Sequence, residues 1–170
     1  KGIAAVPTER CRLVTDVPPP FYFLQFYRHA EQYGAVFVGS EYTFCLAGAW
    51  DEVTDGHWQP AKSLKEMGIE LKTREDGLRV MARWWDECGH TASFYLPQFR
   101  SDLMVQLARE WRADGAVLHL NRGCEGMSLG QMENRLALME AGFPVSTFEG
   151  NFADKRELDE TQVLDRLDSF

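Results

Sequence analysis

The chain has 170 residues, of which 45% are hydrophobic and 26% charged, and its formal net charge is −8 at pH 7. This length and composition fit one ordinary globular domain with a core of its own. The acidic balance argues against nucleic acid and against an anionic membrane as partners, since both favour basic surfaces. No apolar run approaches the roughly 20 residues needed to cross a bilayer, and the N-terminus shows no signal-peptide pattern.

The N-terminal part of the chain predicts a βαβ unit. Residues 12–17 form a short apolar run that we interpret as a strand, ended by prolines at 18–20. A helix is predicted over 21–33, because prolines cost little at the start of a helix. Gly34 suits the left-handed C-cap of this helix. Residues 35–38 are a second apolar run and predict the next strand.

The middle of the chain is less regular. Residues 41–60 are rich in aromatic side chains and predict a long loop or short irregular elements. A helix is predicted over 76–88, and a stronger one over 99–113, where large apolar residues recur every four positions. We treat 50–98 as an insertion packed against a single α/β domain that covers 1–170. The apolar face of the first of these helices consists of Leu78, Met81, Trp85 and Cys88.

The last third of the chain has the clearest pattern. Residues 116–120 predict a strand, and 121–127 predict a loop. Ser128, with Gln131 three residues later, has the pattern of a capping box. We therefore expect Ser128 to open a helix that Gly142 ends. The stripe expected to face the core is Leu129, Met132, Leu136 and Met139.

The C-terminal end completes an alternation of strands and helices. Residues 144–148 predict a strand, and Asp159 with Gln162 predicts the cap of a final amphipathic helix. Strands alternating with helices require a parallel sheet covered on both faces, and right-handed crossovers restrict its topology. The sequence therefore predicts the α/β class: a small doubly wound parallel sheet of about four strands, flavodoxin-like or Rossmann-like, with a helical insertion.

This topology also predicts where a ligand would bind. A strand order 2-1-3-4 places the switch point of the sheet between the strands at 12–17 and 116–120. Ligands of doubly wound sheets bind outside the carboxyl ends of the strands at that point. The loops 17–21 and 121–128 would meet there, so we expect the site between them.

The loop 121–128 has the composition of a binding loop. Gly123 and Gly126 let the backbone turn tightly and approach a ligand closely, and Arg122 supplies a fixed positive charge. Cys124 lies just before a predicted helix, whose N-terminal N–H groups favour a thiolate. We therefore name all four as candidate ligand-binding residues and Cys124 as a candidate metal ligand; no catalytic residue is assigned. The alternative is that the glycines serve only a tight turn and that Arg122 pairs with Glu125 or a neighbouring carboxylate.

The cysteines lie singly along the chain, and none forms a C-x-x-C pair. This argues against a self-contained zinc site or a thioredoxin-like pair. A lone cysteine is most often a small buried hydrophobe, and we interpret Cys11, Cys45 and Cys88 in this way. With no secretory signal, we expect reduced thiols and a cytoplasmic protein. Because the chain begins at Lys1 rather than Met, we expect it to be part of a longer protein.

Three segments carry a resemblance to a known family. Residues 118–126 (LHLNRGCEG), 131–135 (QMENR) and 148–151 (FEGN) resemble the C-terminal signature of the benzoyl-CoA reductase and 2-hydroxyacyl-CoA dehydratase family. The stretch 11–44, with its proline-rich turn, is similar to the start of the same terminal domain. The details favour a subunit of the benzoyl-CoA reductase type over a dehydratase.

The resemblance implies an iron–sulfur enzyme. Members are cytoplasmic, oxygen-sensitive enzymes of anaerobes, built from two related subunits with [4Fe-4S] clusters. A separate ATP-dependent iron–sulfur activator delivers electrons, which pass singly to a CoA thioester. The outcome is reduction of the aromatic ring of benzoyl-CoA or loss of water from a 2-hydroxyacyl group.

The same resemblance assigns roles within the loop. It makes Cys124 one cluster ligand, with the other cysteine ligands in an earlier domain, so the isolated chain is expected to be inactive. Cys11 and Cys45 remain alternative second ligands. The N–H groups around Gly123 and Gly126 become candidate donors to cluster sulfurs, and Arg122 would stabilise negative charge on the cluster or substrate.

Two other classes of function stay open at this point. One is a small-molecule-binding or regulatory α/β domain that uses the loop as an anion-binding nest. The other is a structural domain whose aromatic surface docks a sister subunit. We assign the aromatic group in 21–27 to the core, because aromatic side chains dominate cores.

Overall fold

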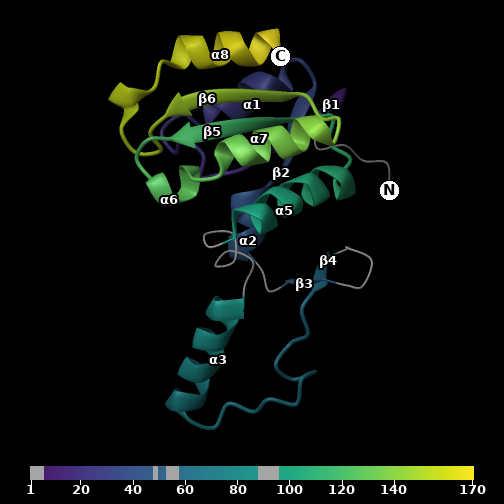
Figure 1. The fold of residues 1–170 in the computed structure, drawn as a ribbon, viewed down its shortest axis with the longest axis vertical. Coiled ribbons are helices and arrows are strands. Elements are labelled where there is room, and N and C mark those ends of the chain that lie inside the picture. The colour runs from purple at the N-terminus through teal and green to yellow at the C-terminus, as the bar shows by residue number, and fades with distance from the viewer. Residues whose placement is uncertain (1–5, 48–49, 53–57, 88–95) are drawn as a thin grey trace.

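The computed structural model describes residues 6–47, 50–52, 58–87 and 96–170. Its centre is a parallel sheet with the order β2-β1-β5-β6 (Figure 1). The strands are β1 (Cys11–Thr15), β2 (Ala35–Ser40), β5 (Gly115–Asn121) and β6 (Val145–Gly150). The doubly wound parallel sheet with the order 2-1-3-4 is thus confirmed.

The register of the strands makes β5 longer than β1 at the predicted switch point. β1 pairs with β5 only from Leu13 opposite Gly115 to Thr15 opposite Val117. β6 follows β5 to its last residue, where Asn121 pairs with Gly150. β5 therefore continues past the end of β1, and the residues that follow β1 fill the space beside it.

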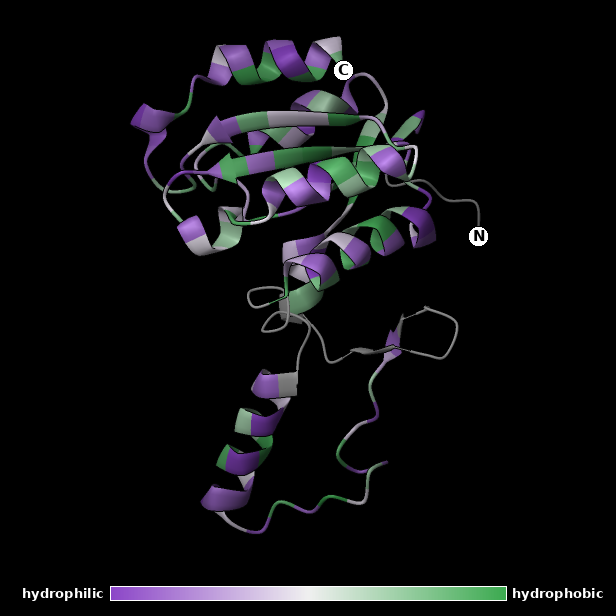
Figure 2. Cartoon of the chain, viewed as in Figure 1, coloured by the Kyte–Doolittle hydropathy of each residue, from purple (hydrophilic) through white to green (hydrophobic). Residues whose placement is uncertain are grey.

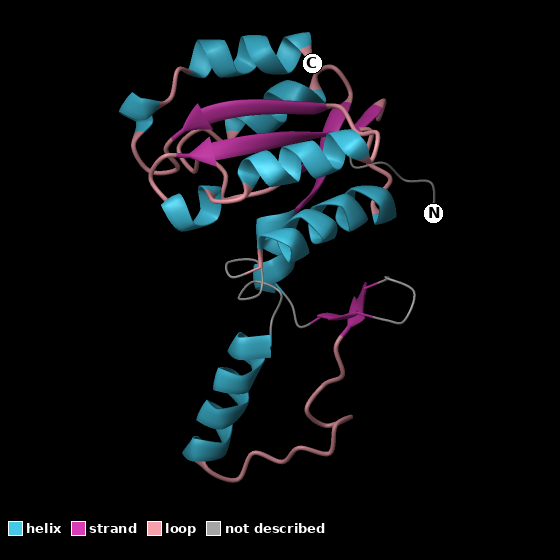
Figure 3. Cartoon of the chain, viewed as in Figure 1, coloured by secondary structure: helices cyan, strands magenta, loops and turns pink. Residues whose placement is uncertain are grey.

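Helices cover both faces of the sheet (Figures 1 and 3). α1 (Gln25–Glu31) and α8 (Glu160–Ser169) lie on one face, and α5 (Pro97–Glu110) and α7 (Gln131–Glu140) lie on the other. Each pair of helices closes one half of the core. The buried residues on the α1 and α8 side are Leu13, Phe23, Phe26, Val117, Phe148, Leu158 and Val163. Those on the α5 and α7 side are Val14, Met104, Ala108, Ala113, Ala116, Leu118 and Leu138.

Phe26 shows how the aromatic residues of the N-terminal segment contribute to the core. Its ring is 2% exposed, and it lies 5.5 Å from the ring of Phe37 and 5.2 Å from that of Phe148. Burial of such a side chain stabilises the fold by about 1.5–3 kcal/mol. Phe23 is buried beside it, whereas Phe21 is exposed. Much of the aromatic group therefore belongs to the core, as expected.

Helix α1 is shorter than predicted. A turn in which the Phe23 N–H donates to the carbonyl of Pro20 precedes it, so the helix begins at Gln25. The turn lets Phe23 enter the core while Leu24 stays 49% exposed. Gly34 follows the helix with φ +81°, the left-handed conformation predicted for it.

A regular helix stands at the start of the segment where we expected a long loop or short irregular elements. α2 (Glu41–Ala47) follows β2 directly, and Phe44 and Cys45 from it are buried against Leu103 and Leu107 of α5. The helix is too short to show a helical period in the sequence, and long-range burial stabilises it. The interpretation of Cys45 as a buried residue is confirmed.

The prediction for α7 was wrong about which face is buried. Ser128 does not open the helix: it ends the short helix α6 (Glu125–Ser128), and Gly130, with φ +80°, is the N-cap of α7. The predicted core stripe is exposed, from 51% at Met139 to 71% at Leu129. Asn134 faces inward instead and accepts a hydrogen bond from Ser101 Oγ of α5 at 3.0 Å. The side chains of the exposed stripe are Leu129, Met132, Leu136 and Met139.

The described residues between α2 and α5, 50–52 and 58–87, extend away from the sheet (Figure 1). They contain the short strands β3 (Trp50–Glu52) and β4 (Trp58–Pro60) and the helix α3 (Arg74–Glu87). Figure 2 shows apolar bands on α3, and three residues of its predicted apolar face are exposed: Leu78 by 53%, Met81 by 67% and Trp85 by 50%. We expected this helix to pack against the core, and its described face does not. Cys88 lies outside the described residues, and an insertion at 50–98 stays a prediction.

The final helix agrees with its predicted cap. The Asp159 carboxylate accepts a hydrogen bond from the Gln162 N–H at 3.0 Å, and Val163 of α8 is buried. Across the described ranges, no helix combines the length and the apolar character that a membrane crossing requires.

Candidate functional site

Three loops meet at the carboxyl edge of the sheet. We predicted that the loop after β1 and the loop after β5 would meet there, and the loop after β6 stands between them. The Phe21 N–H donates to the carbonyl of Phe152 at 3.2 Å, and the Tyr22 hydroxyl donates to the carbonyl of Asn151 at 2.8 Å. The Phe152 N–H donates to Asn121 Oδ1 at 3.2 Å. The third loop thus links the two that the sequence singled out.

Cys124 lies on the surface of this junction rather than in a core. Its side chain is half-buried and belongs to neither face of the hydrophobic core. The residue is the N-cap of α6, and its N–H donates to the carbonyl of Asn121 at 3.2 Å. The thiol therefore stands at the predicted edge, on a turn whose backbone is held by hydrogen bonds.

Asn121, the last residue of β5, organises that turn. Its Oδ1 accepts hydrogen bonds from the N–H groups of Gly123 at 3.1 Å and Phe152 at 3.2 Å. Its own N–H donates to Ser128 Oγ at 3.0 Å, and Ser128 Oγ donates to its carbonyl at 2.7 Å. Asn121 is 0% exposed, and its Nδ2 has no partner among the described residues.

The two candidate glycines, Gly123 and Gly126, differ in their surroundings. A Cβ at Gly123 would lie 2.6 Å from Asn151 Oδ1, so a larger residue would force the Asn151 side chain to move. The Gly123 N–H is already bound to Asn121 and is not a spare donor. Gly126 lies inside α6 and is exposed.

Arg122 is bound by a side chain of β6, and it lines a separate depression of about 440 Å³. Its guanidinium forms a 2.5 Å ion pair with Glu149, and both side chains are about half exposed. This pair raises the pKa of Arg122. The alternative interpretation, in which Arg122 pairs with a neighbouring carboxylate, describes this structure.

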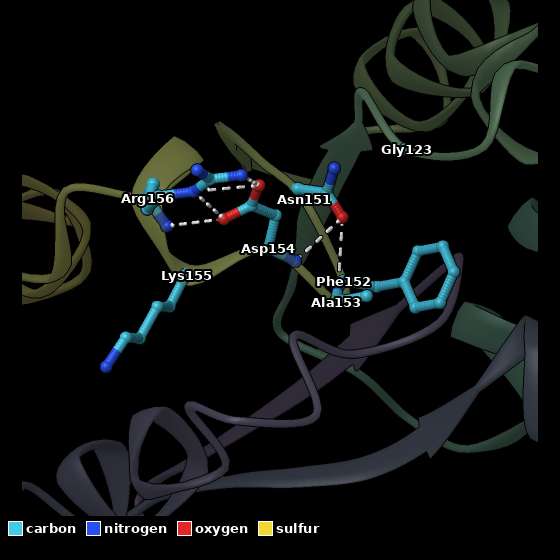
Figure 4. Close-up of a pocket in the computed structure, with 7 residues that line it drawn as sticks. All are labelled: Gly123, Asn151, Phe152, Ala153, Asp154, Lys155 and Arg156. Atoms are coloured by element: carbon cyan, nitrogen blue, oxygen red, sulfur yellow. Dashed lines mark hydrogen bonds and ion pairs between the residues drawn. The ribbon is translucent and has the colours of Figure 1, made fainter.

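A depression of about 640 Å³ lies between the turn of Cys124 and the loop after β6 (Figure 4). Gly123 forms one wall, and the loop after β6 forms the rest. Asn151 Oδ1 accepts from the N–H groups of Ala153 and Asp154 at 2.9 and 3.1 Å. The Asp154 carboxylate binds the Arg156 guanidinium, which lowers the pKa of Asp154 to about 2. This wall is therefore fixed by hydrogen bonds within its own loop.

The other cysteines do not join Cys124. Cys11 begins β1 at the amino end of the sheet, opposite to the edge that carries Cys124. Cys45 is buried among the side chains of α2 and α5. Within the part of the chain that the structure describes, no group of three histidine, cysteine or acidic residues could hold a metal ion. The described residues therefore offer one thiol at this edge.

A buried ionic cluster that the sequence did not reveal lies behind the turn. Asp16 accepts hydrogen bonds from the His119 N–H at 3.0 Å and from Gln131 Nε2 at 3.4 Å. Arg100 Nε lies 3.3 Å from a carboxylate oxygen of Glu41. Burial raises the pKa of Asp16, and it raises that of Glu41 to about 7. Arg100 Nη1 also donates to the carbonyl of Leu129 at 2.6 Å, so the cluster supports the start of α7.

His119 is a core residue of β5. Its ring stacks on Phe148 at 4.6 Å with an interplanar angle of 10°. Nδ1 lies 3.0 Å from the carbonyl of Pro18, and since a carbonyl only accepts, Nδ1 carries the proton. Burial lowers the pKa of His119, which favours this neutral form.

The residues that build the junction share one feature that a sequence can show. Asp16 and Asn151 directly follow an apolar strand, and Asn121 ends one. A polar side chain at the carboxyl end of a parallel strand faces the edge where ligands bind. The sequence does not show which of these side chains reach one another, because their partners lie up to 129 residues away along the chain.

The fold and the edge site define a doubly wound α/β domain with a thiol-bearing turn at its topological switch point. A model of the family described as 2-hydroxyglutaryl-CoA dehydratase, D-component, matches residues 1–170. The chain belongs to this family.

Two curated relatives refine the comparison. The chain is 38% identical over 73 residues to the (R)-2-hydroxyisocaproyl-CoA dehydratase alpha subunit of Clostridioides difficile, which covers 42% of this chain and 17% of the relative. It is 28% identical over 165 residues to a subunit of the benzoyl-CoA reductase of Thauera aromatica, which covers 95% of this chain and 33% of the relative. The chain thus spans a third or less of the length of either relative. The resemblance noted in the sequence is confirmed.

Proposed function

We propose that this domain supplies one thiolate, that of Cys124, to a [4Fe-4S] cluster in an enzyme that transfers low-potential electrons to a CoA thioester. The reaction is reduction of an aromatic ring of the benzoyl-CoA type. The observation that carries the proposal is the position of Cys124, half-buried on a fixed turn at the carboxyl edge of the sheet.

The residues around Cys124 fit one corner of such a cluster. A thiolate is the usual ligand of iron–sulfur clusters, and Cys124 is half-buried at the edge of the sheet rather than enclosed in the core. The buried Nδ2 of Asn121, without a partner among the described residues, adds an unused donor three residues away. A cluster needs several thiolates, so the remaining ligands would come from another part of the enzyme. When bound, the cluster supplies single electrons; this chain holds it in place and limits its contact with water.

The surrounding enzyme follows from the same proposal. A related sister subunit and an ATP-dependent iron–sulfur activator would be the protein partners, and the location would be cytoplasmic. Benzoyl-CoA reduction is favoured because the similarity to the benzoyl-CoA reductase of Thauera aromatica extends over 95% of this chain.

Dehydration of a 2-hydroxyacyl-CoA is the second candidate reaction. It is supported by the higher identity, 38%, to a dehydratase alpha subunit, although over 73 residues only. Turnover of benzoyl-CoA and of a 2-hydroxyacyl-CoA by the assembled enzyme separates the two reactions, since each consumes a different substrate.

The test is replacement of Cys124 by alanine in the complete, anaerobically purified protein. We expect Cys124→Ala to lose most of the cluster iron and the reductive activity, because one thiolate ligand is gone. Cys11→Ala, at the opposite end of the sheet, is the matched control and should keep both. Unchanged iron and activity in Cys124→Ala would refute the proposal. Tight phosphate binding by the metal-free chain would instead support an anion-binding domain.

A further inference from the structure

The carboxamide of Asn121 connects two loops that are far apart in the sequence. One oxygen, Oδ1, accepts the N–H of Gly123 in the turn of Cys124 and the N–H of Phe152 in the loop after β6. Because the side chain is 0% exposed, water does not compete for these two hydrogen bonds. This oxygen atom therefore ties the position of one loop to that of the other.

The backbone of Asn121 is held from the other end of the same turn. Its carbonyl accepts from the N–H of Cys124 at 3.2 Å and from Ser128 Oγ at 2.7 Å. The turn 121–128 is thus bonded to Asn121 near its beginning, by Gly123 and Cys124, and at its end, by Ser128. Contacts of this kind determine where a ligating side chain sits, which must be defined to within about 0.5 Å.

We propose that Asn121 is the positioning residue of the Cys124 thiol, through its Oδ1 and not through its amide nitrogen. This rests on the proposed function of Cys124 as a ligand, and it adds the residue that orients the ligand before any cluster binds. Nδ2 takes no part in the two contacts. An aspartate at this position would keep both acceptor contacts, whereas an alanine would remove them.

The thiols themselves provide the readout, in the full metal-free chain. Alkylation by iodoacetamide, followed residue by residue with mass spectrometry, measures how often each cysteine becomes accessible. We expect Asn121→Ala to raise the alkylation rate of Cys124 about tenfold or more. Cys45, which is 4% exposed, reports global unfolding and should not change. Asn121→Asp should restore the slow rate at Cys124.

Asn134→Ala is the matched control. Asn134 is also 0% exposed, and its Oδ1 accepts a hydrogen bond from Ser101, which does not belong to the three loops. This variant should leave the alkylation rate of Cys124 at its original value. Equal rates at Cys124 in Asn121→Ala and in the original chain would overturn the proposal, as would equal acceleration by Asn134→Ala.

A second measurement needs no substitution and decides the matter if Asn121→Ala also exposes Cys45. The N–H groups of Gly123 and Phe152 should exchange with deuterium about tenfold or more slowly than that of Gly126. Unprotected exchange at Gly123 and Phe152 would overturn the proposal. Neither experiment involves iron, so iron retained in Cys124→Ala contradicts the proposed function alone.

Discussion

The carboxyl edge of the sheet and the segment that carries α3 are built in opposite ways. At the edge, hydrogen bonds join residues far apart in the sequence, such as Tyr22 with Asn151 and Asp16 with His119. Around α3, the described side-chain hydrogen bonds are local, as between Thr73 and Asp76. The fold therefore fixes the geometry of the edge, whereas the hydrogen bonds described around α3 come from neighbouring residues. A site that needs defined geometry belongs at the edge.

The largest expected effect of this difference concerns the buried ionic cluster. Arg100→Met leaves the carboxylates of Asp16 and Glu41 buried without a cation and should destabilise the fold by about 3–5 kcal/mol. Arg79→Met removes the exposed pair with Glu75 in α3 and should cost less than about 1 kcal/mol. Urea unfolding measures both losses, and similar values for the two variants would show that the cluster and α3 do not differ in how their charges are supported.

Two methionines offer the same test for packing. Met104 is 0% exposed and Met81 is 67% exposed. Met104→Ala should lower the free energy of unfolding by about 2–5 kcal/mol, because it leaves a cavity beside the sheet. Met81→Ala should change it by about 0.5 kcal/mol or less. A loss at Met81 as large as that at Met104 would show that α3 is packed against something.

The ionic cluster also predicts a pH dependence. Burial raises the pKa of Glu41 from 4.5 to about 7, so the folded state holds a proton that the unfolded state has released. The stability from this group is therefore present below about pH 4.5 and lost as pH rises through about 7. The free energy of unfolding of Glu41→Gln should rise relative to that of the original chain by up to about 3 kcal/mol as pH increases from about 5 to about 8, because glutamine does not titrate. The measurement is the free energy of unfolding of both proteins as a function of pH, and a constant difference between them would contradict the prediction. Glu75→Gln, in the exposed helix α3, is the control and should give such a constant difference.

Glycine substitutions should give the smallest effects, with opposite signs in the two regions. Gly123→Ala brings a Cβ to within 2.6 Å of Asn151 and should destabilise the fold by about 1–3 kcal/mol, the usual cost of overpacking. Gly77→Ala in α3 meets nothing within 4 Å and should stabilise the helix by about 0.5–1 kcal/mol. Thermal unfolding detects the two shifts, and a stabilising Gly123→Ala would mean that the loops are further apart.

The sequence predicted the sheet because its strands are short apolar runs between clear breakers. It placed Cys124 at the correct edge for the same reason, since the order of strands decides which loops share an edge. It failed at α7, where the apolar stripe points outward and Asn134 faces α5. The prediction assumed that apolar residues of a helix face the core and that polar residues face water. In α7 the polar Asn134 is buried and bound to Ser101, so the opposite face of the helix is exposed.

Other features depend on partners that no local pattern shows. The short helix α2 exists because Phe44 and Cys45 bury against α5. Arg122 was expected to face a ligand, but Glu149 of the neighbouring strand binds it. The buried Asp16, Glu41 and Arg100 come from three separate elements, so only the folded chain brings their charges together.

The central claim is that the sulfur of Cys124 binds iron, and electron paramagnetic resonance of the reduced cluster tests it most directly. The Cys124→Ser variant of the complete protein replaces that sulfur with oxygen and leaves the rest of the turn in place. We expect an altered spectrum and a shifted midpoint potential, because both depend on the ligands of the cluster. A cluster with the original spectrum and potential in Cys124→Ser would contradict it.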